Sequence, residues 1–363
     1  MIMWDVAIIG AGLAGITCAR QLTAAGKRVC ILDKSRGLGG RMATRRVNNR
    51  TRVDHGLPDW SPQTESLKAL TDELLVANVI KPWVFNAYEI QQREVLTRVD
   101  RGPVYLASEG MSAIAKHLSQ DFTPNVNLFF QQRAASLSYH SSGQDDGWRI
   151  RCDGGQVIAA KRCVITIPAP QAADLLNTYP EDDSLSSGLA AAIASLKAVD
   201  YSPCLTVLAG YKKHRYNEME QLSADGDVTG WTVTDITGTS TRWIGLDSSK
   251  RDRTDGPVIV IHSKPAFAQR YIDSGDLQPA ASVLLRANAR KLCSWIAQPE
   301  WFQVKRWRYS QVNRPYSEAM LAVGDSLFLG GDWCSGFEES ETAKNIDAAY
   351  LSGQAIAQAL QTV

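Results

Sequence analysis

A glycine-rich turn near the start of the chain has the spacing of a dinucleotide-binding site. Residues 10–15 read GAGLAG, the pattern G-x-G-x-x-G, and Asp33 closes the next short apolar run. In such a turn the first glycine permits the tight bend, the second lets a pyrophosphate approach the backbone, and the third allows close helix–strand packing. A carboxylate at Asp33 can accept the hydroxyls of a ribose. An unrelated glycine turn is the alternative, and the turn alone fits NAD and FAD equally well.

A second motif, directly after Asp33, distinguishes the two cofactors. Residues 36–44 read RGLGGRMAT, which resembles the R-x-G-G-R-x-x-[ST] segment of the FAD-binding family that contains amine oxidases and phytoene desaturases. In that family the paired glycines permit a loop that folds over the pyrophosphate, and the arginines neutralise it. A nucleic-acid patch is the alternative interpretation of the arginines in residues 41–52. Their place inside the motif and the net charge of +1 argue against it.

The C-terminal part of the chain also resembles this family. Residues 329–332 read LGGD, similar to the family's final signature, in which the aspartate bonds the ribityl chain of FAD. The helix beyond it, expected to open near residues 342–345, would direct its positive end at the flavin, where negative charge gathers on reduction. A core strand followed by an ordinary amphipathic helix is the alternative. Together the motifs predict non-covalently bound FAD.

Within the family, the chain resembles renalase-like flavoproteins. The resemblance implies hydride transfer from the 2- and 6-dihydro isomers of NAD(P)H to the flavin, with oxygen as acceptor and hydrogen peroxide as product. Two segments depart from the pattern: residues 57–60 read LPDW where the family usually continues Ala-Gln-Tyr, and loop 334–344 carries Glu338, Glu339 and Glu341. The segments that carry the resemblance are spread over nearly the whole chain and are 39–44, 53–56, 109–113, 243–251, 260–263, 306–309, 331–333 and 346–353.

The resemblance also implies which residues form the site. The catalytic candidates are His262, His55, Trp307 and Trp243, with His262 nearest the flavin face, where it would orient a carboxamide rather than move a proton. Trp333 is a further candidate for lining the pocket, and structural histidines and tryptophans in core or surface packing are the alternatives. The five histidines show no metal-ligand spacing, so no metal site is expected. The expected cofactor-binding residues are Gly10, Gly12, Ala14, Gly15, Asp33, Lys34, Arg36, Gly40, Arg41, Met42, Gly56, Gly331, Asp332, Asn345 and Ile346.

The pattern of apolar residues indicates which elements position these side chains. Short apolar runs at 6–9 and 29–32 flank a helical pattern at 13–25, which predicts a strand–helix–strand unit with parallel strands. The predicted fold class is α/β: a discontinuous Rossmann-like FAD-binding domain and a mixed-sheet α+β substrate domain. We expect the FAD-binding domain to comprise residues 1–57, 104–170 and 318–363, and the substrate domain to comprise 58–103 and 171–317.

Composition excludes several other classes of protein. The chain has 363 residues, and Lys plus Arg number 39 against 38 Asp plus Glu, so no strongly basic nucleic-acid-binding face is expected. No run approaches 18 apolar residues, and the first residues show no basic leader, so neither a membrane span nor a signal peptide is predicted. The seven cysteines are scattered without C-x-x-C spacing. These features predict a cytoplasmic protein with no nucleic-acid or membrane partner.

The expected partners are therefore a small-molecule substrate and oxygen. The substrate is either a dihydronicotinamide dinucleotide, as the renalase-like segments imply, or an amine. The alternatives to the renalase-like reaction are a flavin amine oxidase or desaturase-type oxidoreductase, and a non-catalytic flavin redox sensor. The sequence leaves the oligomeric state open.

Overall fold

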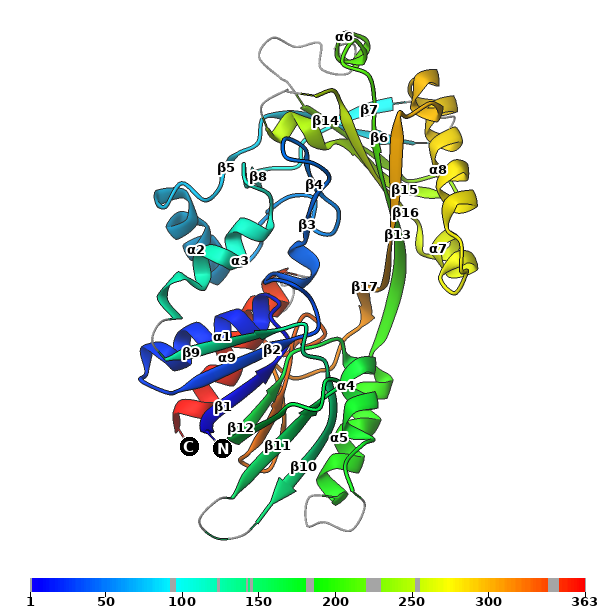
Figure 1. The fold of residues 1–363 in the computed structure, drawn as a ribbon. Coiled ribbons are helices and arrows are strands. Elements are labelled where there is room, and N and C mark those ends of the chain that lie inside the picture. The colour runs from blue at the N-terminus through cyan, green and yellow to red at the C-terminus, as the bar shows by residue number, and fades with distance from the viewer. Residues whose placement is uncertain are drawn as a thin grey trace.

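The computed structural model describes residues 2–91, 96–122, 125–141, 143, 146–180, 186–219, 230–251, 255–338 and 346–362. These residues build two large sheets with helices packed on them (Figure 1). The helices are α1 (Leu13–Ala24), α2 (Glu65–Val76), α3 (Ser112–Leu118), α4 (Ala169–Leu176), α5 (Ser186–Ala198), α6 (Arg215–Met219), α7 (Pro265–Tyr271), α8 (Gln278–Lys291) and α9 (Ile346–Thr362). Short 3-10 helices are η1 (Gly40–Met42), η3 (Gln120–Phe122), η5 (Asp247–Lys250) and η6 (Ser294–Ala297).

The first sheet contains the predicted strand–helix–strand unit, and its central strands are parallel. Its order is β10-β11-β12-β1-β2-β9, with β19 paired to β12 and β18 paired to β19. The strands are β1 (Met3–Ile9), β2 (Val29–Asp33), β9 (Val126–Phe130), β10 (Ala134–His140), β11 (Gly147–Cys152), β12 (Val157–Ile165), β18 (Leu321–Val323) and β19 (Leu327–Leu329). The antiparallel strands β10 and β11 extend the sheet beyond β12.

Helices cover both faces of this sheet. Because successive side chains of a strand point to opposite faces, each strand contributes to both helical layers. In β1, Val6 and Ile8 pack with α1, α3 and α9, whereas Ala7 and Ile9 pack with α4 and α5. Figure 1 shows the two helical layers on opposite sides of the sheet. The parallel order brings the carboxyl ends of β1, β2, β12 and β19 to one edge, where open α/β sheets bind their ligands.

The second sheet has the order β17-β13-β16-β15-β14-β6-β7 and is mostly antiparallel. Its strands are β6 (Phe85–Ile90), β7 (Leu96–Val99), β13 (Asp200–Gly210), β14 (Gly230–Asp235), β15 (Thr241–Leu246), β16 (Val258–Ser263) and β17 (Trp301–Arg314). One face packs under α7 and α8. The other faces the hairpin of β3 (Thr44–Arg46) and β4 (Arg52–Asp54), as Figure 1 shows. A small pair, β5 (Lys81–Pro82) and β8 (Tyr105–Leu106), lies beside α2 and α3.

The predicted fold class is confirmed, while two segments pack differently from the predicted domain division. Helix α2 and the buried Trp60 and Ile80 belong to the core of α1 and α3, although residues 58–103 were expected in the substrate domain. Helices α4 and α5 pack on the first sheet, although residues 171–317 were expected in the substrate domain. Their apolar stripes cannot specify which sheet they cover. Among the described residues, no helix is long and apolar enough to cross a membrane.

Candidate functional site

The glycine turn between β1 and α1 has the geometry that a dinucleotide requires. Gly10 has a φ of +113°, and a Cβ on Gly15 would lie 2.1 Å from the carbonyl oxygen of Gly10, so both positions require glycine. A Cβ on Gly12 would meet nothing within 4 Å, which leaves its backbone open to a ligand. The turn therefore leaves the backbone open at the amino end of α1, where N–H groups and the helix dipole favour phosphates.

Asp33 lies at the end of β2, where the sequence predicts a ribose-binding carboxylate. Its Oδ2 accepts the backbone N–H of Ala11 at 2.8 Å, and its Oδ1 accepts that of Ser35 at 2.7 Å. Asp33 thus fixes the glycine turn and remains partly exposed. Lys34 and Arg36 follow it as exposed side chains beside the same edge of the sheet.

The loop after β2 folds over the glycine turn, as its resemblance implies. The Gly39 N–H donates to the Ala11 carbonyl oxygen at 2.8 Å. Gly40 has a φ of +52°, and a Cβ there would lie 3.3 Å from the Gly12 Cα. A larger residue at Gly40 would press on the turn that the pyrophosphate is expected to approach. The residues present therefore fit the dinucleotide part of FAD.

Arg41, in the same loop, reaches the opposite end of the sequence. Its Nη1 and Nη2 lie 2.5 Å and 2.6 Å from the two carboxylate oxygens of Asp332, and Nη1 also donates to the carbonyl oxygen of Tyr309 at 3.3 Å. The Tyr201 hydroxyl lies 3.5 Å from Asp332 Oδ1. The ion pair brings the motif loops after β2 and β19 together at the ligand edge of the first sheet.

The remaining predicted cofactor residues fall into three groups. Gly56 and Gly331 occupy positions that favour glycine: a Cβ on Gly56 would lie 2.0 Å from the Arg41 carbonyl oxygen, and Gly331 has a φ of +152°. Ala14, Met42 and Ile346 instead contribute to the core around α1 and α9, so their side chains support the site. Asn345, with Glu339 and Glu341, lies outside the described residues, and Glu338 is exposed.

His55 and Trp307, predicted as catalytic candidates, are brought together although they are far apart in sequence. Their rings stack with centroids 5.3 Å apart and an interplanar angle of 23°. The indole N–H of Trp307 donates to the carbonyl oxygen of His55 at 3.0 Å. Burial, with repulsion from Lys305, lowers the pKa of His55 to about 4, so this imidazole is neutral at pH 7.

Trp243 and His262, the other two candidates, lie side by side on the second sheet. The register pairs Trp243 with His262 and His262 with Thr206, so the three side chains form a row on the face toward the β3–β4 hairpin. The rings of Trp243 and His262 are 5.1 Å apart. Burial, with repulsion from Arg242, lowers the pKa of His262 to about 3.

The polar atoms of this row share one property. Trp243 Nε1, His262 Nε2 and Thr206 Oγ1 are all buried, and none has a hydrogen-bond partner among the described residues. The Nδ1 atom of His55 is likewise buried and has no hydrogen-bond partner among the described residues. Buried polar groups are normally paired, so unpaired ones gathered on one face mark a candidate place for a ligand. Sequence reasoning missed Thr206, because a lone threonine in an apolar strand carries no signal.

A buried ionic cluster supports the segment that contains His55. It comprises Asp54, Asp247, Lys250 and Arg251, and Lys250 Nζ lies 2.7 Å from Asp247 Oδ1 while Arg251 Nη2 lies 2.5 Å from Asp54 Oδ2. Lys250 also donates to the carbonyl oxygen of Pro58 at 2.5 Å. Although burial opposes it, the charges of Arg251 and Lys250 hold the pKa of Asp54 below its usual value. The four charges cancel, and the cluster anchors β4 to the second sheet.

Trp333, a further candidate for lining the pocket, is instead a core side chain. It is 1% exposed, and its indole N–H donates to the carbonyl oxygen of Ile167 at 3.1 Å.

A pocket of about 310 Å³ adjoins the Arg41–Asp332 pair, and Tyr201 and Tyr309 are among its lining residues.

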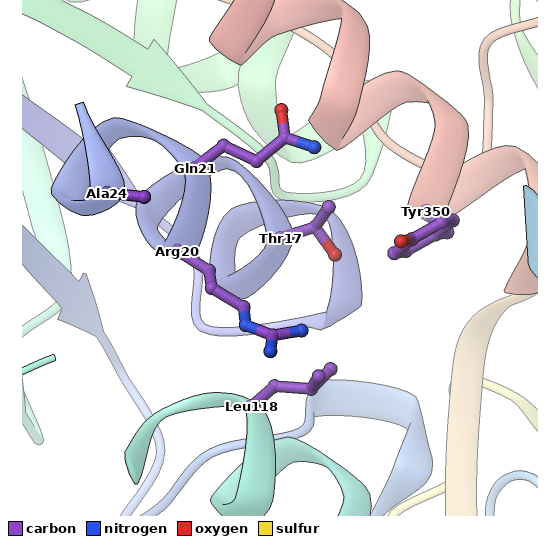
Figure 2. Close-up of a pocket in the computed structure, with 6 residues that line it drawn as sticks. All are labelled: Thr17, Arg20, Gln21, Ala24, Leu118 and Tyr350. Carbon is purple, nitrogen blue, oxygen red and sulfur yellow. The ribbon is translucent and has the colours of Figure 1, made fainter. Parts of the chain in front are cut away.

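Another pocket, of about 200 Å³, lies among α1, α3 and α9 (Figure 2). Its cation, Arg20, is held by Glu73 through two hydrogen bonds of 3.0 Å and 2.8 Å. None of the residues predicted for the site lines this pocket, which separates it from the candidate site. Its lining residues are Thr17, Arg20, Gln21, Ala24, Leu118 and Tyr350.

Two family models match the chain. Residues 8–74 match the NAD(P)-binding Rossmann-like domain, and residues 93–361 match the flavin containing amine oxidoreductase. The putrescine oxidase of Kocuria rosea is 41% identical over 71 residues, which are 19% of this chain and 14% of that protein. The chain therefore aligns with only a small part of that relative.

Solved structures share the fold over nearly the whole chain. A putrescine oxidase bound to putrescine has a TM-score of 0.69 at 13% identity, with 98% of each chain covered. A cyclohexylamine oxidase from Brevibacterium oxydans has a TM-score of 0.69 at 12% identity, with 99% of each chain covered. At these identities the likeness concerns the fold.

Proposed function

We propose that this chain, which belongs to the family of flavin-containing amine oxidoreductases, oxidises the 2- and 6-dihydro isomers of NAD(P)H to NAD(P)+. The family confirms the predicted enzyme class and flavin cofactor, and the fit of the glycine turn and its covering loop supports FAD, bound without a covalent link. Oxygen is the proposed final acceptor, with hydrogen peroxide as product. FAD, when bound, supplies the acceptor of the hydride and the group that oxygen reoxidises.

One observation carries this proposal: the row of unpaired polar atoms on the second sheet is uncharged. The low pKa of His262, about 3, keeps its ring neutral, and Trp243 and Thr206 carry no charge. A dihydronicotinamide ring is flat and uncharged, and its carboxamide both donates and accepts hydrogen bonds. A protonated amine would need a carboxylate, but Asp54, adjacent to His55 in sequence, is already bonded to Arg251.

The side chains then act by orientation. Hydride transfer requires a close and aligned approach of the two rings more than it requires a proton acceptor. A neutral His262 suits this task, because it can hold a carboxamide without exchanging a proton. The stacked His55 and Trp307 provide a flat apolar surface that excludes water from the same region.

Amine oxidation is the second candidate, and the solved structures of putrescine and cyclohexylamine oxidases favour it. An amine could bind this neutral face in its deprotonated form. A redox sensor without turnover is the third candidate, and it would bind FAD but consume no substrate.

Aerobic turnover distinguishes the three. The FAD-loaded protein is mixed with each dihydro isomer, with ordinary NADH, with putrescine or with cyclohexylamine, while substrate loss and hydrogen peroxide are followed. We expect the isomers to give NAD(P)+ and peroxide in equal amounts, much faster than ordinary NADH does. Peroxide from an amine alone would support amine oxidation, and no peroxide from any compound would support the sensor.

A further inference from the structure

Arg45 lies on the face of the β3–β4 hairpin that is directed at the second sheet. It pairs with Val53 across the hairpin, and Val53 packs against Trp243 and Val260 of that sheet. Because directly opposed residues of an antiparallel pair point to the same face, Arg45 shares the orientation of Val53. Its neighbour Arg46 pairs with Arg52 and lies on the other face, where Arg52 is bound to Glu109.

Lys305 approaches the same region from the second sheet. It pairs with Thr206, which in turn pairs with His262, so this charged side chain lies next to the uncharged row, on the neighbouring strand. Trp307, which stacks on His55, lies two residues further along β17 and therefore on the same face. Lys305 is half-buried, and burial with repulsion from Arg45 lowers its pKa. Repulsion from both cations also lowers the pKa of the half-buried His55.

Arg45 and Lys305 differ from Arg41 and Arg251 in lacking a counter-ion among the described residues. Arg41 is paired with Asp332, and Arg251 with Asp54 and Asp247. Among the residues that the structure describes, no carboxylate forms an ion pair with Arg45 or Lys305. Arg45 is exposed and Lys305 is half-buried, so the two like charges repel each other where solvent gives access to an anion that would offset the repulsion.

From this arrangement we infer that Arg45 and Lys305 form an anion subsite that takes a phosphate group of the substrate. The inference rests on the proposed function, because a dinucleotide substrate carries a pyrophosphate and its dihydronicotinamide ring would lie on the adjacent neutral row. Arg45 offers a planar fork of N–H donors that matches phosphate oxygens, and Lys305 offers a point charge beside the ring. The ring would thus lie on the neutral row of the second sheet, and the phosphate beside it, between that sheet and the β3–β4 hairpin.

Calorimetric titration of the FAD-loaded protein tests this subsite with two probes, ADP-ribose and inorganic pyrophosphate. We expect ADP-ribose to bind, and Lys305→Gln and Arg45→Gln each to weaken it about tenfold, since charged hydrogen bonds to phosphate are lost. Arg46→Gln, the matched control on the other face of β3, should bind ADP-ribose as the unsubstituted protein does. All three variants should retain their flavin, measured by absorbance after denaturation.

The two probes separate the possible sources of the anion. Tighter binding of ADP-ribose than of pyrophosphate, with both affinities dependent on Lys305, supports a substrate subsite. Binding of pyrophosphate alone would overturn the assignment to a dinucleotide, and ADP-ribose affinities that are equal in Lys305→Gln and the unsubstituted protein would overturn the subsite itself.

Kinetics keep this inference distinct from the proposed function. If the isomers are oxidised but both variants leave their KM unchanged, the subsite is wrong and the proposed function stands. If no isomer is oxidised while ADP-ribose affinity still depends on Lys305, the subsite stands and the proposed function fails.

Discussion

Arg41 and Asp332, near opposite ends of the chain, form a bidentate ion pair with N–O distances of 2.5 Å and 2.6 Å. The Asp332 side chain is 6% exposed and that of Arg41 is 33% exposed. The pair joins the loop after β2 to the end of β19, so that the two motifs with the strongest family resemblance are bonded to each other. Asp332, expected to bond the ribityl chain, has a protein partner as well.

Arg41→Ala should therefore lower the free energy of unfolding and the flavin content together. Removing the guanidinium leaves a nearly buried carboxylate without its partner, which costs about 1.5–3 kcal/mol. Urea unfolding of the flavin-free protein measures the first effect, and flavin absorbance after dialysis measures the second. Asp332→Ala should show the same pair of losses. Flavin content that stays full in both variants would mean that the pair serves the fold alone.

FAD should accompany the protein through purification, because the glycine turn, the covering loop and the end of β19 all meet at one edge of the first sheet. The purified protein should be yellow, and heat or acid should release intact FAD into solution. A folded, colourless protein that takes up NAD but no FAD would contradict the cofactor assignment.

Lys250→Met should destabilise the protein by about 3–5 kcal/mol, because it leaves an excess negative charge in the buried cluster of Asp54, Asp247 and Arg251. The exposed pair of Lys68 and Glu65 supplies the control: Lys68→Met should cost less than about 1 kcal/mol. Urea midpoints of the two variants give the comparison. Equal midpoints would contradict the structural role of the cluster.

Stability should decline with acid because of His262. In the unfolded chain this histidine takes up a proton near its ordinary pKa of 6.5, whereas in the folded protein its pKa is about 3. The unfolded state therefore binds more protons below pH 6.5, and the free energy of unfolding falls as the pH falls from 6.5 toward 3. His262→Gln should reduce this slope between pH 6.5 and 4.5, above the range in which most carboxylates titrate. An unchanged slope, measured by urea unfolding at several pH values, would contradict a buried neutral imidazole.

The parts of the site predicted from sequence are those with local signals. The glycine turn and Asp33 lie within one strand–helix–strand unit, so their spacing predicts their geometry, and the adjoining loop around Gly40 was predicted from its resemblance to a family motif. The cluster of Asp54 with Lys250 could not be predicted, because charged residues far apart in sequence are more often solvated. Thr206 could not be predicted as a site residue either, because only the strand register places it beside His262.

Anaerobic stopped-flow mixing of the FAD-loaded protein with the dihydro isomers tests the central claim most directly. The flavin absorbance should be lost rapidly with the 2- and 6-dihydro isomers, and far more slowly with ordinary NADH, putrescine or cyclohexylamine. His262→Ala should slow this loss at unchanged flavin content, because an orienting contact is removed from the transition state. Rapid loss of absorbance with an amine, and none with either isomer, would contradict the account and establish amine oxidation in its place.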